Sequence, residues 1–376
     1  MRYSEAEVLA ERVLPLGVYR LVVRVDGRRA SEARRRLFTG RTTANFTSVS
    51  QAKFFDTEDS PRSPDRRTNR VPLEGPTLEA GCRLSQVPIQ MQSSNLAAAY
   101  PQVAHPNAER YGLRSLEHLP RYLASPLHAP TIDAFKGAEA WLQGLEGRPP
   151  VILDSGCGTG RSTCMLARKH PDAAIIGLDR SEARLEATLA QVPPNALLVR
   201  AECSSFWRLL LQRDVEGAGM SGLSAARVRH HFLLYPNPYP KAARLNLRWH
   251  GHPALPVLCG LGGTLELRSN WNVYLNEFLG AARSLTGTAS DAAQLAISRW
   301  PKEEEEGSAA TAAARLCASR LSARGLAMHG HRGRLLTELP PLRHEDDALT
   351  LFERKFHLQG ERLYRLRLPE WPSAPT

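Results

Sequence analysis

Apolar strands and amphipathic helices alternate along residues 151–285, and this pattern restricts the fold more than any other feature of the chain. Short apolar runs predict five strands, at 151–153, 174–178, 196–199, 231–234 and 263–268. Helical spacing predicts helices at 131–145, 161–169, 182–189 and 271–285. Strands that alternate with helices in this way predict a mainly parallel sheet covered on both faces.

The segment after the first strand is rich in glycine and predicts a ligand-binding loop. Gly156, Gly158 and Gly160 have G-x-G-x-G spacing directly before a helix. Glycine permits positive φ angles and lets backbone N–H groups come close to a ligand. The spacing differs from the dinucleotide pattern G-x-G-x-x-G, and Arg161-Ser162 replaces the Lys-Ser/Thr that ends a phosphate-binding loop. The alternative is a tight turn without a ligand.

Acidic residues stand at three successive strand ends around this loop. Asp154 precedes the glycines, Asp179 ends the second strand and Glu202 follows the third. The arrangement resembles motif I and the following acidic positions of the class I S-adenosylmethionine-dependent methyltransferases. The resemblance implies that Asp154 and the glycine loop hold the amino-acid moiety of the cofactor. It also implies that Asp179 accepts hydrogen bonds from the ribose hydroxyls and that Glu202 recognises the adenine.

Two polar segments follow the fourth and fifth strands. They read Tyr235-Pro236-Asn237-Pro238-Tyr239-Pro240-Lys241 and Ser269-Asn270-Trp271-Asn272-Val273-Tyr274. In order and spacing they resemble the tRNA (guanine-N7)-methyltransferase family, which has Phe-Pro-Asp-Pro-Trp-x-Lys and then Thr-Asp-x-x-x-Tyr. The resemblance covers roughly residues 96–285 and a terminal hairpin expected from 350–356 and 363–368. It implies an α/β fold of the Rossmann-like class I methyltransferase type, whose seven-stranded, mostly parallel sheet ends in that C-terminal antiparallel hairpin.

The same resemblance implies methyl transfer to guanine N7 of tRNA. Asn237 is then expected to meet the target base, and Ser269, Asn270 and Tyr274 to form the far wall of the pocket. Guanine N7 carries a free lone pair, so the reaction needs alignment of N7, methyl carbon and sulfur and no prior removal of a proton. Asn237 and Asn270 stand where the family has Asp, and Ser269 where it has Thr. An amide still accepts a hydrogen bond, without the charge-assisted strength of a carboxylate.

The segment around Asn237 leaves other interpretations open. Asn237-Pro238-Tyr239 is also similar to the Asn-Pro-Pro-Tyr motif of amino-methyltransferases, which would imply an adenine amino group or a protein amide as the target. A third interpretation is a proline turn with a structural asparagine. A non-catalytic RNA-binding or scaffold protein that keeps the fold is the alternative from another functional class.

Basic residues after the proline-rich segment predict contact with RNA. Lys241, Arg244 and Arg248 recur at roughly helical spacing, so one helix face would present three cations to a phosphate backbone. An ordinary solvated helix face is the alternative. Tyr239 and Trp249 are candidates either to stack on an unpaired base or to pack in the core. The expected partner is tRNA or another structured RNA, and the sequence names no protein partner.

Composition bounds the remaining expectations. The chain has 49 Lys+Arg against 38 Asp+Glu, a formal charge of +11 that suits a polyanionic partner. None of the six cysteines forms a Cys-x-x-Cys pair, so we expect a reducing compartment, the cytoplasm, and no structural metal. No apolar run approaches the roughly 18 residues of a membrane span, so no membrane partner is expected.

The domain organisation follows from where the alternation begins and breaks. Residues 1–95 mix arginine runs with Ser, Thr and Pro and are expected to be a basic extension of low order. Its Arg and Ser content leaves organelle targeting open, although acidic residues argue against a transit peptide, among them Asp26, Glu32, Asp56, Glu58 and Asp59. A methyltransferase domain is expected at 96–376, with an inserted helical or loose segment at about 286–347.

Overall fold

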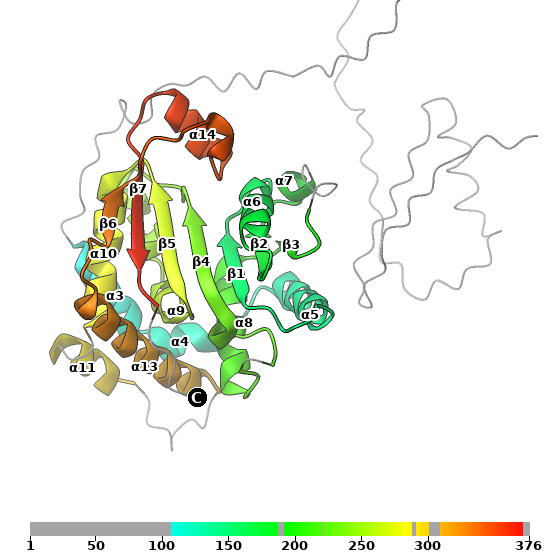
Figure 1. Ribbon diagram of the computed structural model, residues 1–376. Coiled ribbons are helices and arrows are strands. Elements are labelled where there is room, and N and C mark those ends of the chain that lie inside the picture. Colours follow the sequence, from blue (N-terminus) through cyan, green and yellow to red (C-terminus); the bar gives the residue numbers. More distant parts are fainter. Residues whose placement is uncertain (1–106, 187–191, 220, 288–290, 301–308, 371–376) are drawn as a thin grey trace, which may run out of the picture. The chain divides into compact units, whose positions relative to one another are not determined.

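The computed structural model describes residues 107–186, 192–219, 221–287, 291–300 and 309–370, all of which belong to one unit of the chain (Figure 1). The expected N-terminal extension, residues 1–95, lies outside the described residues. In the described part of the chain, no helix is long and apolar enough to cross a membrane.

Seven strands form one sheet in the order β3-β2-β1-β4-β5-β7-β6. The strands are β1 Val151–Ser155, β2 Ala174–Asp179, β3 Ala196–Arg200, β4 Val228–Leu234, β5 Thr264–Ser269, β6 Leu336–Glu338 and β7 Tyr364–Leu368. The first five pair in parallel, and β7 runs antiparallel to both β5 and β6. The predicted fold class is therefore confirmed. Because the first five strands are parallel, their carboxyl ends share one edge of the sheet.

Helices cover the sheet because alternate strand residues are apolar on both faces. The helices are α3 Ala108–Glu117, α4 Leu119–Ala124, α5 Ala129–Gln143, α6 Arg161–Lys169, α7 Glu182–Glu186, α8 Cys203–Val215, α9 Leu255–Gly260, α10 Asn272–Thr286, α11 Asp291–Ser298, α13 Ala309–Gly330 and α14 Leu351–Leu358. On one face, Ile152 and Ile175 pack in a cluster with Leu166 of α6. On the other, Val151 and Leu153 belong to the larger core with residues of α8, α10 and α13.

Helix α13 lies within the segment that the sequence predicted as an insertion, and it is part of the core. Cys317 and Leu321 are fully buried, and α13 packs against α4, α8, α9 and α10. Arg324 is also fully buried and donates to the backbone carbonyls of Leu261, Gly263 and Pro369 at 2.6–3.0 Å. Burial lowers the pKa of Arg324 to about 10. Three carbonyl acceptors thus hold this guanidinium where β5 begins and β7 ends.

The expected C-terminal antiparallel strand pair is present, but its strands are joined through a helix and the predicted first strand is wrong. The predicted strand at 350–356 is helix α14, and β7 pairs instead with β6. The helix begins because the Thr350 hydroxyl accepts a hydrogen bond from the Glu353 N–H at 3.0 Å, an N-cap contact. The sequence carried this signal as Thr-x-x-Glu, which its apolar and aromatic neighbours obscured. Helix α14 lies over the sheet edge where β4 and β5 end (Figure 1).

Candidate cofactor and substrate site

The loop between β1 and α6 has a left-handed backbone at each of its three glycines. The φ angles are 80° at Gly156, 62° at Gly158 and 82° at Gly160, values that side-chain-bearing residues adopt only with strain. The N–H groups of Gly156 and Cys157 both donate to the Leu178 carbonyl, at 2.7 and 3.0 Å. These bonds fix the loop against the end of β2.

The glycines differ in what surrounds them. A Cβ at Gly160 would lie 2.7 Å from the end of the Leu198 side chain, which would have to shift to accept a larger residue. A Cβ at Gly156 or Gly158 would meet no atom within 4 Å of the described chain. The space above the first two glycines is therefore open to a ligand, while the third closes the loop against β3.

Asp154 lies at the foot of this loop and is completely buried. Its Oδ2 accepts hydrogen bonds from the hydroxyls of Ser162 and Thr163 at 2.5 and 2.7 Å. Burial raises the pKa of this carboxyl to about 6, although the two hydroxyls favour the charged form. Oδ1 is buried and has no hydrogen-bond partner among the described residues. A buried acceptor of this kind suits a ligand that brings a hydrogen-bond donor or positive charge.

Asp179 closes the opposite side of the loop at the carboxyl end of β2. Its side chain is 5% exposed. Oδ2 accepts from the Gly158 N–H at 3.0 Å, and Oδ1 accepts from the Ser181 N–H at 2.8 Å. The exposed guanidinium of Arg184 lies 3.1 Å from Oδ1. Asp179 is thus built into the glycine loop, with its carboxylate at the rim where a ribose was expected.

Glu202 caps the N-terminus of α8, a role that the sequence analysis did not predict. It is the N-cap of α8, and its carboxylate accepts hydrogen bonds from the backbone N–H groups of Ser204 and Ser205 at 3.2 and 2.7 Å. Burial opposes its charge, but the hydrogen bonds from Ser205 and Ser204 together outweigh burial and lower the pKa of Glu202. The predicted adenine contact at Glu202 stays a prediction, and the cap fixes its carboxylate toward α8.

The proline-rich loop follows β4, which is paired with β1 so that Phe232 lies opposite Asp154. Tyr235 and Tyr239 have φ angles of 53° and 39°, which makes this a tightly turned loop. Asn237 is exposed between them, and its Oδ1 accepts a hydrogen bond from the Tyr239 N–H at 3.1 Å. The loop therefore stands beside the glycine loop at the carboxyl edge and presents the amide nitrogen of Asn237.

The structure corrects the predicted phosphate-binding role of Arg248. Its side chain is 2% exposed and lies 2.5 Å from Glu277, which is 3% exposed. It also donates to the Pro238 and Tyr239 carbonyls at 2.6 and 3.2 Å. Arg248 therefore braces the proline-rich loop from inside.

The other two predicted cations, Lys241 and Arg244, are exposed at the start of a 3₁₀ segment, Ala242–Leu247. The helical spacing of the three cations did not reveal this division, because it depends on Glu277 in α10. Trp249, the aromatic candidate for a base or for the core, is partly buried and packs against Trp207, with ring centroids 4.7 Å apart.

The predicted far wall contains one buried aromatic and two residues of the β5 edge. Tyr274 is fully buried and its hydroxyl accepts from the Trp249 N–H at 3.2 Å. Ser269 is buried and accepts from the Trp271 N–H at 3.0 Å. Asn270 is partly buried and its amide donates to Glu361 at 2.7 Å. Tyr274 and Ser269 support the loops from within, and Asn270 lies at the rim.

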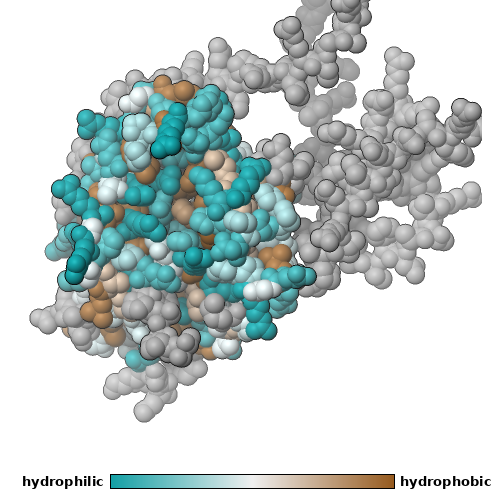
Figure 2. All heavy atoms as spheres, in the orientation of Figure 1, coloured by the Kyte–Doolittle hydropathy of each residue, from teal (hydrophilic) through white to brown (hydrophobic). Residues whose placement is uncertain are grey.

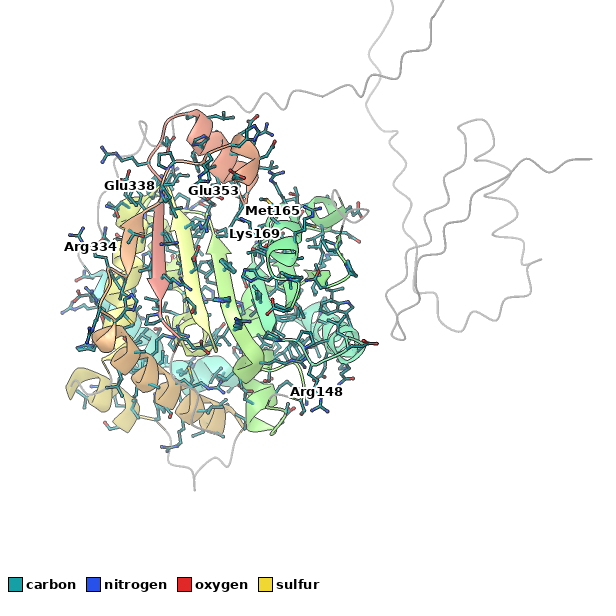
Figure 3. All side chains as sticks on the ribbon, viewed as in Figure 1. Arg148, Met165, Lys169, Arg334, Glu338 and Glu353 are labelled. Carbon is teal, nitrogen blue, oxygen red and sulfur yellow. The ribbon has the colours of Figure 1, made fainter. Side chains whose placement is uncertain are left out.

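Sequence reasoning missed a polar cluster between α14 and the sheet. Arg268 lies 2.8 Å from Glu266 and 2.7 Å from Glu353. Glu353, labelled on α14 in Figure 3, is 1% exposed. Burial, with the nearby Glu353 charge, raises the pKa of Tyr235. The Thr-x-x-Glu signal at 350–353 was the one clue in the sequence. This cluster holds α14 against β5, and the ring of Phe356 in α14 lies 5.9 Å from that of Tyr235.

A second missed cluster lies behind the glycine loop. The indole N–H of Trp207 donates to Ser155 Oγ at 3.0 Å, and Ser155 Oγ lies 2.8 Å from Nε2 of His231. His231 is 1% exposed, and burial lowers its pKa to about 3, so its ring is neutral at physiological pH. The three side chains connect β1, β4 and α8 directly below the loop.

Within the described ranges, no group of three or more His, Cys, Asp or Glu side chains is placed to hold a metal ion. A cavity of about 490 Å³ lies between α3 and α11, and its lining contains none of the predicted site residues.

Comparisons with known proteins identify relatives of known reaction. A family model described as a methyltransferase domain matches residues 152–216. A tRNA (guanine-N(7)-)-methyltransferase of Nitrosomonas europaea is 28% identical over 209 residues, 54% of this chain and 85% of that protein. One of Nitrosomonas eutropha is 26% identical over 49% of this chain and 77% of that protein. A trans-aconitate 2-methyltransferase of Methylobacterium radiotolerans is 49% identical over 12% of this chain and 17% of that protein.

Solved structures give more distant matches. A variant of the 16S rRNA (adenine(1408)-N(1))-methyltransferase from Catenulisporales acidiphilia, with its cosubstrate SAM, is 17% identical over 67% of this chain and 96% of that chain, with a TM-score of 0.31. The matched methyltransferase model covers β1 to α8, which contain the glycine loop and its acidic residues. The chain therefore contains a methyltransferase domain, and the model match, the strand order and the Nitrosomonas relatives together support a divergent member of the class I S-adenosylmethionine-dependent methyltransferases.

Proposed function

We propose that the chain transfers a methyl group from S-adenosylmethionine to N7 of a guanine in tRNA. The observation that carries the proposal is the meeting of three loops at one sheet edge: the glycine loop after β1, the Asn237 loop after β4 and the Ser269-Asn270 segment after β5. The two Nitrosomonas relatives carry this activity in their names, and this chain aligns with them over most of their length.

The residues at the glycine loop fit the cofactor. S-adenosylmethionine would bring a methyl group on a positively charged sulfur. The unpartnered Oδ1 of Asp154 suits its ammonium group, reached directly or through water, and the open space at Gly156 and Gly158 suits a ligand close to the backbone. Asp179, at the rim of the same loop, is placed to accept from ribose hydroxyls in exchange for its contact with the exposed Arg184.

Asn237 is proposed to orient the guanine. Because its Oδ1 accepts from the Tyr239 N–H, its amide nitrogen is the group left to face a ligand. Guanine carries the O6 acceptor next to N7, so an amide N–H can hold O6 and thereby direct N7 toward the methyl group. Alignment of this kind accounts for catalysis without a proton transfer, since N7 is unprotonated before the reaction.

Lys241 and Arg244 are proposed to contact the phosphate backbone. Both side chains are exposed, unlike that of Arg248. Replacing either one with Ala should lower the slope of log affinity against log salt by about one. An Arg248→Gln variant that remains folded should keep the wild-type slope. A lower salt slope for Arg248→Gln, with unchanged slopes for the Lys241 and Arg244 variants, would contradict the proposal that Lys241 and Arg244 contact phosphates.

The test of the function is a methyl-transfer assay with labelled S-adenosylmethionine and total small RNA, followed by identification of the labelled nucleoside. We expect 7-methylguanosine in tRNA. Label in an adenine, in protein or in no product would overturn the proposal. Asn237→Ala and Asn237→Asp both remove the amide donor, and each should lower kcat/KM about 5- to 10-fold, as for one lost hydrogen bond. Unchanged rates in both variants would remove Asn237 from the site.

A further inference from the structure

Helix α14 has several large apolar side chains that are exposed to solvent and do not pack against the sheet. Leu351, Phe352 and Leu358 are 53%, 54% and 65% exposed. They are three of the six large apolar side chains that are exposed in the described part of the chain. Figure 2 shows brown atoms at the top of the molecule, over α14, within a mainly hydrophilic surface. A concentration of this kind on one short helix indicates a binding surface.

The aromatic side chains of α14 form a row that leads to the substrate loop. The rings of Phe352 and Phe356 are stacked, with centroids 6.2 Å apart and planes inclined by 28°. Phe356 in turn lies 5.9 Å from the ring of Tyr235. Since Tyr235 begins the segment that carries Asn237, the row runs from the exposed Phe352 to the edge where the base is proposed to bind.

Hydrogen bonds fix α14 in this position. Glu353 accepts from Arg268 at 2.7 Å and from the Leu349 N–H at 2.6 Å. Just before the helix, the Asp346 carbonyl accepts from Arg161, the first residue of α6, at 3.2 Å. The helix is therefore connected both to β5 and to the helix that follows the glycine loop. The exposed ring of Phe352 is therefore held at a fixed distance from the glycine loop and from the loop that carries Asn237.

The polar neighbours of these rings favour a nucleic acid over an apolar partner. Lys355 Nζ lies 5.9 Å from the ring centroid of Phe356. Arg354, which is paired with Glu345, and His357 are further basic residues on the same helix. Aromatic rings beside cations are the combination that binds unpaired nucleotides, because the rings stack on bases and the cations attract phosphates.

We propose that Phe352, supported by Phe356, is a stacking platform for an unpaired base of the RNA substrate, next to the base that is methylated. This proposal rests on the proposed RNA methyltransferase function and names a part of the substrate that the site selects: an unpaired loop. Loss of one base–aromatic stack weakens affinity about 5- to 150-fold.

The test is RNA binding by the full chain, with and without Phe352→Ala. Two synthetic RNAs serve as probes: a hairpin with an unpaired guanine-containing loop, and a blunt duplex with the same stem and no loop. We expect Phe352→Ala to weaken hairpin binding about 5- to 150-fold and to leave duplex binding within about twofold. Leu326→Ala on α13, where Leu326 is 76% exposed, is the matched control and should change neither.

Two conservative variants separate stacking from apolar packing. Phe352→Tyr should keep hairpin affinity, and Phe352→Leu should lose most of it, because leucine has no ring to stack. Equal hairpin affinity for Phe352→Leu and the wild type would overturn the platform, as would a shift of the thermal midpoint in Phe352→Ala without any change in RNA affinity. The latter result would mean that Phe352 packs against the protein.

Failure of the platform is distinguishable from failure of the function. If the wild type methylates the hairpin and Phe352→Ala does so with the same KM, the stacking proposal fails and the RNA methyltransferase proposal stands. If the wild type neither binds nor methylates any RNA, the proposed function fails and the platform fails with it.

Discussion

The burial of Arg248 leads to a prediction that separates a structural from an RNA-binding role. Glu277→Gln keeps the volume of the side chain and removes its negative charge, so the guanidinium of Arg248 would stay buried without compensation. Both side chains are at most 3% exposed, so water cannot replace the lost partner. Removal of one member of a buried ion pair destabilises a protein by about 3–5 kcal/mol. We expect about 3 kcal/mol, because glutamine keeps one acceptor for Arg248 and for His250, which lies 2.9 Å from the same oxygen.

The assay is urea unfolding followed by tryptophan fluorescence. The exposed pair Arg229 and Asp172, 3.2 Å apart, supplies the control, and Asp172→Asn should change the free energy of unfolding by no more than about 0.5 kcal/mol. A double variant, Arg248→Met with Glu277→Leu, should recover part of the loss, because no isolated charge remains. An equally small change in the free energy of unfolding for Glu277→Gln and Asp172→Asn would refute the reasoning, because it would mean that Arg248 and Glu277 are exposed to water.

Four further predictions concern the loop and its support. Asp179→Asn should weaken S-adenosylmethionine binding by about 1–3 kcal/mol in calorimetry, and unchanged affinity would place Asp179 outside the site. Because burial raises the pKa of Asp154 to about 6, cofactor affinity should fall as the pH is lowered through 6, and Asp154→Asn should abolish this dependence. The contribution of the Asp154 carboxyl to folding stability has the opposite sign: it is present below the unfolded pKa and is lost as the pH rises through 6. Gly158→Ala and Gly160→Ala should both lower the thermal midpoint because both backbones have positive φ, and Gly160→Ala should lower it further because its Cβ would displace the Leu198 side chain. Gly158→Ala should also weaken cofactor binding, and a lower thermal midpoint for Gly158→Ala than for Gly160→Ala would contradict the packing argument. Since burial lowers the pKa of His231 to about 3, its contribution to stability is present above the unfolded pKa and lost as the pH falls below about 6.5, and His231→Gln should make urea unfolding less sensitive to acid.

The parallel part of the sheet could be predicted because its signals are local. Helix α6 begins and ends at the predicted residues, Arg161 and Lys169, since a glycine loop precedes it and the apolar spacing is regular. Strand β4 begins three residues before the predicted start, where Val228 to His230 mix polar and apolar side chains. Helix α14 was misassigned because its apolar and aromatic residues suit a strand as well as a helix, and the cap at Thr350 decides between them.

The site was less predictable, because its side chains depend on partners far along the chain. Arg248 and Glu277 are 29 residues apart, and spacing alone placed Arg248 on a face with Lys241 and Arg244. Arg268 and Glu353 are 85 residues apart, so the attachment of α14 to β5 has no local signature beyond the Thr-x-x-Glu cap. Glycine loops and strand-end acids are local features, whereas buried ion pairs are a property of the assembled fold.

The replacement of an expected acid by Asn270 has a physical explanation in the structure. The Asn270 amide donates to Glu361 at 2.7 Å, so a carboxylate still lies at the end of β5, supplied by the turn before β7. An aspartate at position 270 would place two carboxylates in contact, and their repulsion would replace this hydrogen bond. The amide is therefore the residue that Glu361 permits at this position. A carboxylate is thus present at the end of β5 even though position 270 itself carries an amide.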